Sequence, residues 1–171
     1  MKFSINCIQG DIARQPILEA VVNAANAELT TGGGVAGAIH KAAGPDLDKA
    51  CRPLAPISPG QAVITEAFNL PNQYIIHCLG PRYGIDQPED KLLADCYKNA
   101  LNLAEENNIS SIGFPAISTG IFGYPLEEAA RIALNAVSLV EKSDSLTEVV
   151  FVLFSNDQLQ IFEKIKKEVL N

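Results

Sequence analysis

Histidines and paired cysteines are scarce in this sequence, which argues against a metal or redox centre. Its only two histidines, His40 and His77, do not stand at a chelating spacing from any cysteine. The cysteines contain no Cys-x-x-Cys pair; they are Cys7, Cys51, Cys78 and Cys96. We therefore expect no metal and no cofactor, with the cysteines reduced and the histidines serving the core or supporting a site from behind.

Basic residues are also few, with 13 Lys and Arg against 20 Asp and Glu and a formal net charge of -7. Non-specific binding to DNA or RNA depends on basic side chains that displace counterions from phosphates, so we expect no general nucleic-acid binding. A small anion is still a possible ligand, because backbone N–H groups can hold a phosphate whatever the overall charge.

Long apolar runs, repeats and low-complexity tracts are absent from the sequence. No run approaches membrane-spanning length, and the first residues lack the apolar stretch of a signal peptide. We expect a soluble, cytoplasmic protein without membrane association. The 171 residues fall within the usual range for one domain, so residues 1–171 are expected to form a single domain that is a monomer.

Short apolar segments alternate with longer segments of helical periodicity. The sequence predicts strands at residues 3–8, 20–23, 62–65, 74–78, 111–115 and 149–154, and helices at 35–43, 90–107, 126–141 and 157–170. The segment 53–59 is expected to be a surface loop. Parallel strands need crossover connections that cover both faces of a sheet, so the alternation predicts a three-layer α/β/α sandwich with a mixed, largely parallel sheet.

Two glycine-rich loops follow predicted strands and precede predicted helices, at residues 32–37 and 118–123. Ligands bind beyond the carboxyl ends of strands in such sheets, and helix N-termini attract anions. Neither loop contains Lys or Arg, so a phosphate there would be held by main-chain N–H groups and hydroxyls. Two such cradles suggest a diphosphate, although each loop alone could be an ordinary turn.

Gly32, Gly34 and Gly37 also match the G-x-G-x-x-G pattern of dinucleotide-binding enzymes. We disfavour a dehydrogenase, because residues 26–31 separate the loop from its strand and no acidic residue follows at the required distance. The G-x-x-x-x-G-K-[ST] loop of nucleotidases is absent as well.

Taken together, the motifs of this chain resemble those of the macrodomain family, in particular its MacroD-like branch and the viral macrodomains. The motifs are Gly10-Asp11-Ile12, Val22-Asn23-Ala24-Ala25-Asn26, Gly32-Gly33-Gly34-Val35, Gly37-Ala38-Ile39-His40, Ala43-Gly44-Pro45, the segment 77–81 and the segment 115–124. The resemblance covers nearly the whole chain. It implies a mixed sheet flanked by helices, with an ADP-ribose cleft at the carboxyl ends of the strands.

The resemblance also implies roles for individual residues. Asp11 and the Ile12 N–H would recognise adenine, and Phe154 would stack on it, although Asp11 could instead cap a turn and Phe154 could belong to the core. Asn26 would bind the distal ribose, whereas Asn23 is expected to tie the strand end to neighbouring backbone. The implied ligand-binding residues are Asp11, Ile12, Asn26, Gly32, Gly33, Gly34, Val35, Ser118, Thr119, Gly120, Ile121, Phe122 and Phe154.

One departure from the MacroD-like pattern bears on catalysis. Where that branch has an aspartate after Gly-Gly-Gly-Val, this chain has Ala36, which cannot act as a general base. The viral members share this feature and are hydrolases, and for them a substrate phosphate is proposed to orient the water. Asn26 and Gly34 would then be the catalytic residues, through ribose positioning and the loop amides.

The expected function is thus an ADP-ribose-binding hydrolase. Its partners would be ADP-ribosylated proteins carrying mono-ADP-ribose on acidic side chains, or O-acetyl-ADP-ribose. The main alternative is a reader that binds ADP-ribose without turnover. An RNA or poly(ADP-ribose) binder is a third, weaker alternative, because the chain lacks a basic stripe.

Overall fold

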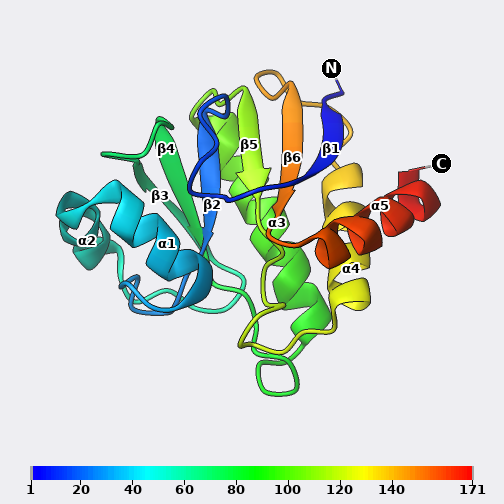
Figure 1. The fold of residues 1–171 in the computed structure, drawn as a ribbon, viewed down its shortest axis with the longest axis horizontal. Helices are drawn as coiled ribbons and strands as arrows, with labels where there is room; N and C mark the ends of the chain where they lie inside the picture. The colour runs from blue at the N-terminus through cyan, green and yellow to red at the C-terminus, as the bar shows by residue number, and fades with distance from the viewer. Residues whose placement is uncertain (1, 171) are drawn as a thin grey trace.

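The computed structural model describes residues 2–170 and contains one six-stranded sheet within them (Figure 1). In chain order the elements are β1 (Ser4–Gln9), β2 (Ala20–Ala24), α1 (Gly34–Ala43), α2 (Pro45–Cys51), the 3-10 helix η1 (Arg52–Leu54), β3 (Ala62–Glu66), β4 (Tyr74–Cys78), α3 (Glu89–Glu106), β5 (Ser111–Phe114), α4 (Leu126–Ser138), β6 (Glu148–Leu153) and α5 (Asn156–Leu170).

The strand order is β1-β6-β5-β2-β4-β3, and every neighbouring pair is parallel except β4 with β3. The parallel pairs are joined by connections that contain helices, as parallel geometry requires. Only residues 67–73 separate β3 from β4, and such a short connection permits antiparallel pairing alone. The expected mixed, largely parallel sheet is confirmed.

Helices cover both faces of this sheet, because side chains along each strand alternate between two hydrophobic clusters. In β6, Val149, Phe151 and Leu153 pack with α3, α4 and α5, whereas Val150 and Val152 pack with α1 and α2. Figure 1 shows α1 and α2 on one side of the sheet and α3 crossing behind it. The expected three-layer arrangement is therefore present.

Helix α4 is shorter than the sequence pattern predicts. It begins after Pro125 as expected, but it ends at Ser138 and not at residue 141. The Lys2 ammonium donates to the carbonyl oxygens of Ser138 and Val140, at 2.9 and 2.6 Å. This long-range contact satisfies carbonyl groups at the helix end and so removes the need for another turn.

Helix α2 was not expected from the sequence. Pro45 occupies its first turn, where a missing N–H costs nothing, and Asp46 and Asp48 favour the positive end of the helix dipole. Leu47 and Cys51, one turn apart, are its buried residues, and this pair is too short a pattern to predict a helix by itself. The segment expected to be a loop at 53–59 begins with the end of η1.

The other predicted elements begin and end within about two residues of the observed ones. Within residues 2–170, none of the helices has the length and apolar character needed to cross a bilayer.

Candidate functional site

A cavity of about 350 Å³ lies beyond the carboxyl ends of β2 and β5, the parallel neighbours at the centre of the sheet. The two glycine-rich loops follow these two strands, so the strand pairing itself brings the loops together. The lining residues are Ala24, Ala25, Asn26, Gly32, Gly33, Gly34, Val35, Ala36, Gly80, Ala116, Ile117, Ser118, Gly120, Ile121 and Phe122.

The first loop presents the N-terminus of α1 to this cavity. Gly33 is the N-cap residue and makes no side-chain cap, and the first turn carries no acidic residue. The N–H groups of Gly34, Val35 and Ala36 precede the first intrahelical donor and have no carbonyl partner within the helix. The loop therefore offers N–H donors and the positive end of a helix dipole to an anion.

Gly37 is required for this loop to lie against the helix. A β-carbon at Gly37 would stand 2.3 Å from the carbonyl oxygen of Gly32, far inside van der Waals contact. The glycine at this position thus permits the close approach of residues 32 and 37, which sets where the loop N–H groups point.

The second loop is closed on itself by main-chain hydrogen bonds. The Tyr124 N–H donates to the Ser118 carbonyl at 2.9 Å, and the Gly123 N–H donates to the Gly120 carbonyl at 3.0 Å. Among the described residues, the N–H groups of Gly120, Ile121 and Phe122 have no protein acceptor. The fixed loop therefore presents a second set of free donors at the same cavity.

Gly80, which the sequence interpretation did not single out, packs against this second loop. A β-carbon at Gly80 would lie 2.1 Å from the Ser118 hydroxyl oxygen and 2.6 Å from a methyl carbon of Ile117. Ser118 itself has φ of 68°, in the left-handed region. Because Gly80 follows β4 and Ser118 follows β5, only the folded chain reveals this contact.

Asn26 lies at the cavity with its amide already engaged by its own loop. Its Nδ2 donates to the Thr30 carbonyl at 2.9 Å, and its Oδ1 accepts from the Thr30 N–H at 3.0 Å. The side chain therefore orders residues 26–30 and is held in one orientation. Oδ1 also accepts from the Thr30 hydroxyl at 3.4 Å, so one amide hydrogen is left for a ligand.

A second cavity of about 430 Å³ adjoins the first, and the two share Gly34, Val35, Ala116 and Gly120. It lies toward β1 and β6, the strands on the far side of β5. Its other lining residues are Gly10, Asp11, Ile12, Ala38, Pro115, Thr119, Val152, Phe154 and Gln158.

Asp11 and Phe154 line the second cavity and do not belong to the hydrophobic core. Asp11 accepts the Ala13 N–H through Oδ1 at 2.9 Å, as a turn-capping carboxylate does, while Oδ2 lies 3.7 Å from the Arg14 guanidinium. Phe154 follows the last residue of β6 and is 82% exposed, so the alternative of a core role for Phe154 is wrong. Its ring is free to stack on a planar ligand.

Gln158 lines the second cavity and was not expected from the sequence. Its side-chain oxygen accepts the Phe154 N–H at 3.1 Å, and this contact links the end of β6 to the first turn of α5. Phe154 and Gln158 are four residues apart, but this spacing indicates a contact only once the end of β6 is known.

His77 is fully buried in β4 and contacts side chains of both neighbouring strands, β2 and β3. Its Nδ1 lies 3.0 Å from the Asn23 amide nitrogen, and its Nε2 lies 3.0 Å from the Thr65 hydroxyl. With the Thr65 hydroxyl hydrogen donated to the Glu66 carbonyl at 2.9 Å, these contacts fit the Nε2–H tautomer of His77, which donates to Thr65 and accepts from Asn23. Burial, followed by the nearby His40, lowers the pKa of His77 to about 3.

Asn23 and His77 therefore form a buried polar contact between β2 and β4. Asn23 bonds to a side chain on the neighbouring strand, whereas the sequence interpretation expected it to tie the strand end to backbone. His40 is also buried, and burial lowers its pKa.

The cysteines are all free thiols. Burial raises the pKa of Cys7 and Cys51 to about 11 and that of Cys96 to about 12, so their reactive thiolate forms are scarce near neutral pH. Residues 2–170 contain no group of three or more His, Cys, Asp or Glu side chains arranged to hold a metal ion.

Ionisable side chains are missing from the lining of the first cavity. Its described residues include no Asp, Glu, His, Lys, Arg, Cys or Tyr. Ala36, at the position considered for a general base, is buried in the first turn of α1 with 4% exposure. Any charge in this cavity would have to come from a ligand.

All of the sequence-predicted ligand-binding residues line one or both cavities. The strand order β1-β6-β5-β2 sets them out along the edge of the sheet. The residues predicted for adenine lie at β1 and β6, and those predicted for the diphosphate and distal ribose lie at β5 and β2. Their roles stay predictions.

Comparisons with known proteins agree with this geometry. The family model described as "Macro domain" matches residues 22–133. A macro domain-containing protein of Chlorobaculum tepidum is 45% identical over 162 residues, covering 94% of each chain. A Klebsiella pneumoniae protein named O-acetyl-ADP-ribose deacetylase is 47% identical over 164 residues, covering 92% of this chain and 93% of the relative.

Solved structures show the same fold. The Oceanobacillus iheyensis macrodomain with ADP has a TM-score of 0.90 and 41% identity, covering 96% of this chain and 90% of that one. The Trypanosoma brucei macrodomain in complex with ADP-ribose has a TM-score of 0.85 and 37% identity, covering 94% of this chain and 68% of that one.

Proposed function

This chain belongs to the macro domain family, and from that premise we propose that it binds ADP-ribose and hydrolyses an ester at the distal ribose. The substrates proposed are mono-ADP-ribose on acidic side chains of proteins and O-acetyl-ADP-ribose. One observation carries the proposal: two sets of free main-chain N–H groups line one cavity beside Asn26, without a basic side chain. Such an arrangement suits a diphosphate joined to a ribose.

The orientation of the ligand follows from the strand order. Adenine lies in the second cavity, where Asp11 accepts from its amino group, the Ile12 N–H donates to a ring nitrogen and the Phe154 ring stacks on it. The diphosphate lies between the two glycine-rich loops. The distal ribose lies in the first cavity, beside Asn26 and Phe122.

The mechanism must work without a side-chain base, because no ionisable residue of the described chain lines the first cavity. A diphosphate oxygen orients a water and takes its proton as the water oxygen bonds to the anomeric carbon. The bond from that carbon to the carboxylate oxygen breaks, and the carboxylate leaves. Asn26 fixes the ribose, and the loop amides, including that of Gly34, stabilise the developing charge. With the acetyl ester, the water oxygen adds to the carbonyl carbon instead. The bond from that carbon to the ribose oxygen then breaks, acetate leaves, and the ribose oxygen takes the proton held by the diphosphate.

The enzymatic side of the proposal is supported by the relatives named O-acetyl-ADP-ribose deacetylase, which are 44–47% identical to this chain. A non-catalytic ADP-ribose reader is the second candidate. Ala36 and the lack of ionisable lining residues favour it, because general-base catalysis is typically worth about 10²–10⁴-fold. Turnover is accordingly expected to be slow.

The experiment that separates the two candidates measures release of ADP-ribose from a protein carrying glutamate-linked mono-ADP-ribose. Calorimetric binding of free ADP-ribose is run on the same preparation. Binding with release supports a hydrolase, binding without release above the uncatalysed rate makes the protein a reader, and absence of binding refutes both.

Two variants of Asn26 refine this experiment. Asn26→Asp keeps the acceptor for the Thr30 N–H but loses the Nδ2 donor to the Thr30 carbonyl. Asn26→Ala loses both of these contacts. If Asn26 orients the reacting ribose, both variants lower kcat more than they raise KM. A change confined to affinity would show that Asn26 has no catalytic part.

A further inference from the structure

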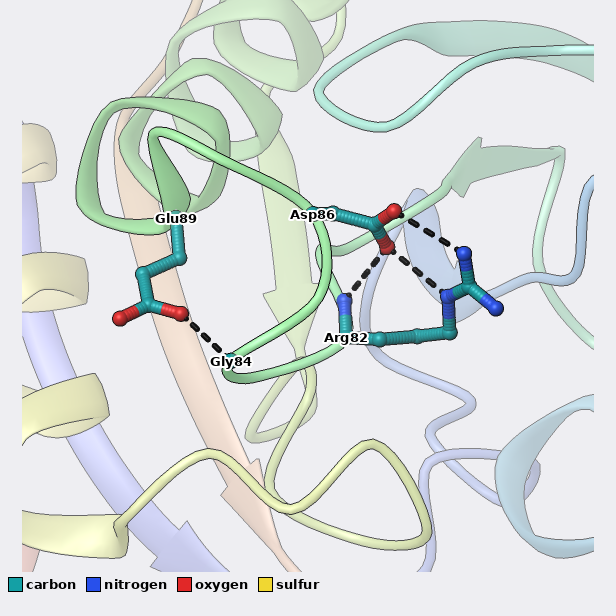
Figure 2. Close-up of polar contacts among 4 residues, drawn as sticks. All are labelled: Arg82, Gly84, Asp86 and Glu89. Atoms are coloured by element: carbon teal, nitrogen blue, oxygen red, sulfur yellow. Dashed lines mark hydrogen bonds and ion pairs between the residues drawn. The ribbon is translucent and has the colours of Figure 1, made fainter.

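The loop between β4 and α3 is held rigidly although it lies at the surface. The Asp86 carboxylate accepts from the Arg82 main-chain N–H at 2.8 Å and from two guanidinium nitrogens at 3.1 Å (Figure 2). The Glu89 carboxylate turns back to accept the Gly84 N–H at 2.7 Å, as Figure 2 also shows. A loop fixed in this way loses little conformational entropy when a partner binds to it.

This loop is continuous with the wall of the first cavity. The Tyr83 N–H donates to the Phe122 carbonyl at 2.9 Å, and the Tyr83 ring packs on that of Tyr124 with centroids 4.9 Å apart. Phe122 lines the cavity, as does Gly80 just before the loop. Since β4 lies beyond β2 in the sheet, the loop stands at the end of the cleft away from the proposed adenine position.

The loop exposes apolar surface that the fold does not use. Ile85 is 63% exposed and Tyr83 is 39% exposed, and only Gly84 separates them in sequence. Figure 1 shows the loop extending beyond the start of α3, beside the segment that joins β5 to α4. We call the exposed side chains of Tyr83 and Ile85 the platform. The proposed contacts with ADP-ribose do not involve it.

Three carboxylates act on the Tyr83 end of the platform. Glu128 is the first cause of a raised pKa at the Tyr83 hydroxyl, followed by burial and by Glu89 and Asp90. The one guanidinium of the loop, that of Arg82, is paired with Asp86, and this pairing lowers the pKa of Asp86. The platform therefore combines exposed apolar surface with negative charge at its Tyr83 end, which favours an apolar residue next to Lys or Arg.

We propose that the platform binds the polypeptide part of an ADP-ribosylated protein and prefers a segment with an apolar residue next to Lys or Arg. This inference rests on the proposed function, because it assumes that the distal ribose occupies the first cavity. The modified side chain then leaves the cleft beside Phe122, and the segment that carries it crosses Tyr83 and Ile85.

The test uses two synthetic peptides in which ADP-ribose is joined to a glutamine amide nitrogen in place of the glutamate ester oxygen. Neither peptide can be turned over as an ester, so affinity is measured whether or not the protein is a hydrolase. One peptide has Leu and Lys neighbours, and in the other each Lys is replaced by Glu. Calorimetry at low salt should show about tenfold tighter binding of the basic peptide, and the preference should shrink as salt is added.

Two variants with matched controls locate the contact. Ile85→Ser and Glu128→Lys should each weaken binding of the basic peptide by about threefold to tenfold and leave the affinity for free ADP-ribose unchanged. Ile17→Ser removes an 85% exposed isoleucine that precedes β2, at the opposite end of that strand from the cleft. Glu127→Lys makes the same charge change in the same helical turn, where Glu127 lies 3.3 Å from Lys164 of α5. Both controls should bind the basic peptide like the unmodified protein.

Equal affinity for the two peptides, or equal effects of variants and controls, would refute peptide binding at the platform. Neither result would contradict the binding of ADP-ribose. Failure to bind free ADP-ribose would overturn the proposed function and this inference with it. Sedimentation could also show a dimer of the unmodified protein that Ile85→Ser abolishes. In that case a second copy of the chain occupies the platform, which contradicts the proposal.

Discussion

Replacing Gly37 by alanine should misplace the first glycine-rich loop without touching the ligand. The added β-carbon would stand 2.3 Å from the Gly32 carbonyl oxygen, so the two must separate by about 1 Å to reach van der Waals contact. A loop N–H that is moved by this amount leaves hydrogen-bond distance of a phosphate oxygen. One hydrogen bond to a charged group is worth about 1.5–3 kcal/mol, so the affinity for ADP-ribose should fall about 10- to 100-fold.

In Gly37→Ala, the free energy of unfolding should fall by less than the binding free energy for ADP-ribose. Overpacking costs about 1–3 kcal/mol, and alanine recovers about 0.5–1 kcal/mol over glycine inside a helix. The net loss of about 0.5–2 kcal/mol corresponds to a drop in Tm of about 2–6 °C for a chain of this size.

Calorimetric titration with ADP-ribose and thermal unfolding measure the two effects. Gly33→Ala is the control for stability, because a β-carbon there meets no atom within 4 Å and the residue has φ of -85°. If Gly37→Ala bound ADP-ribose within twofold of the unmodified protein, the close approach of residues 32 and 37 would not set the donor positions.

Three further predictions address chemistry, specificity and pH. Ala36→Asp supplies a general base and should raise the rate of ester hydrolysis about tenfold or more, whereas the neutral Ala36→Asn should not. Equal rates in the two variants would show that the lack of a base at position 36 does not limit turnover. Asp11→Ala should lose the preference for ADP-ribose over its hypoxanthine analogue, which lacks the amino group, and an unchanged preference by calorimetry would contradict the adenine placement. The folded-state pKa of His77 lies below its ordinary value of 6.5, so the contribution of His77 to the free energy of unfolding should be constant well above pH 6.5 and decrease below it. Between pH 6.5 and 4.5 the decrease should be about 2 kcal/mol by denaturant titration, and His77→Gln should abolish that part of the slope.

Local patterns predicted much of this molecule because the signals were short-range. Continuous apolar runs such as 149–154 indicate a strand buried on both faces, and the glycines at 32–34 mark a loop before a helix whatever surrounds them. The end of α4 at Ser138 did not follow from its own sequence, because Lys2 reaches it from the opposite end of the chain. Helix α2 was missed because its apolar pattern spans only one turn.

By itself, the sequence determined the alternation of strands and helices, the two loops of main-chain donors and the absence of a base at Ala36, since each depends on residues close together in the chain. Only the tertiary structure decided which loops meet. Pairing β5 with β2 places both glycine-rich loops at one cavity. The need for glycine at position 80 also appears only in the fold, where a β-carbon would stand 2.1 Å from the Ser118 hydroxyl oxygen. The neutral state of His77 likewise depends on its burial between neighbouring strands, where Asn23 and Thr65 contact its two ring nitrogens. Such contacts depend on strand order and register, which arise from burial of the whole sheet and which no short segment encodes.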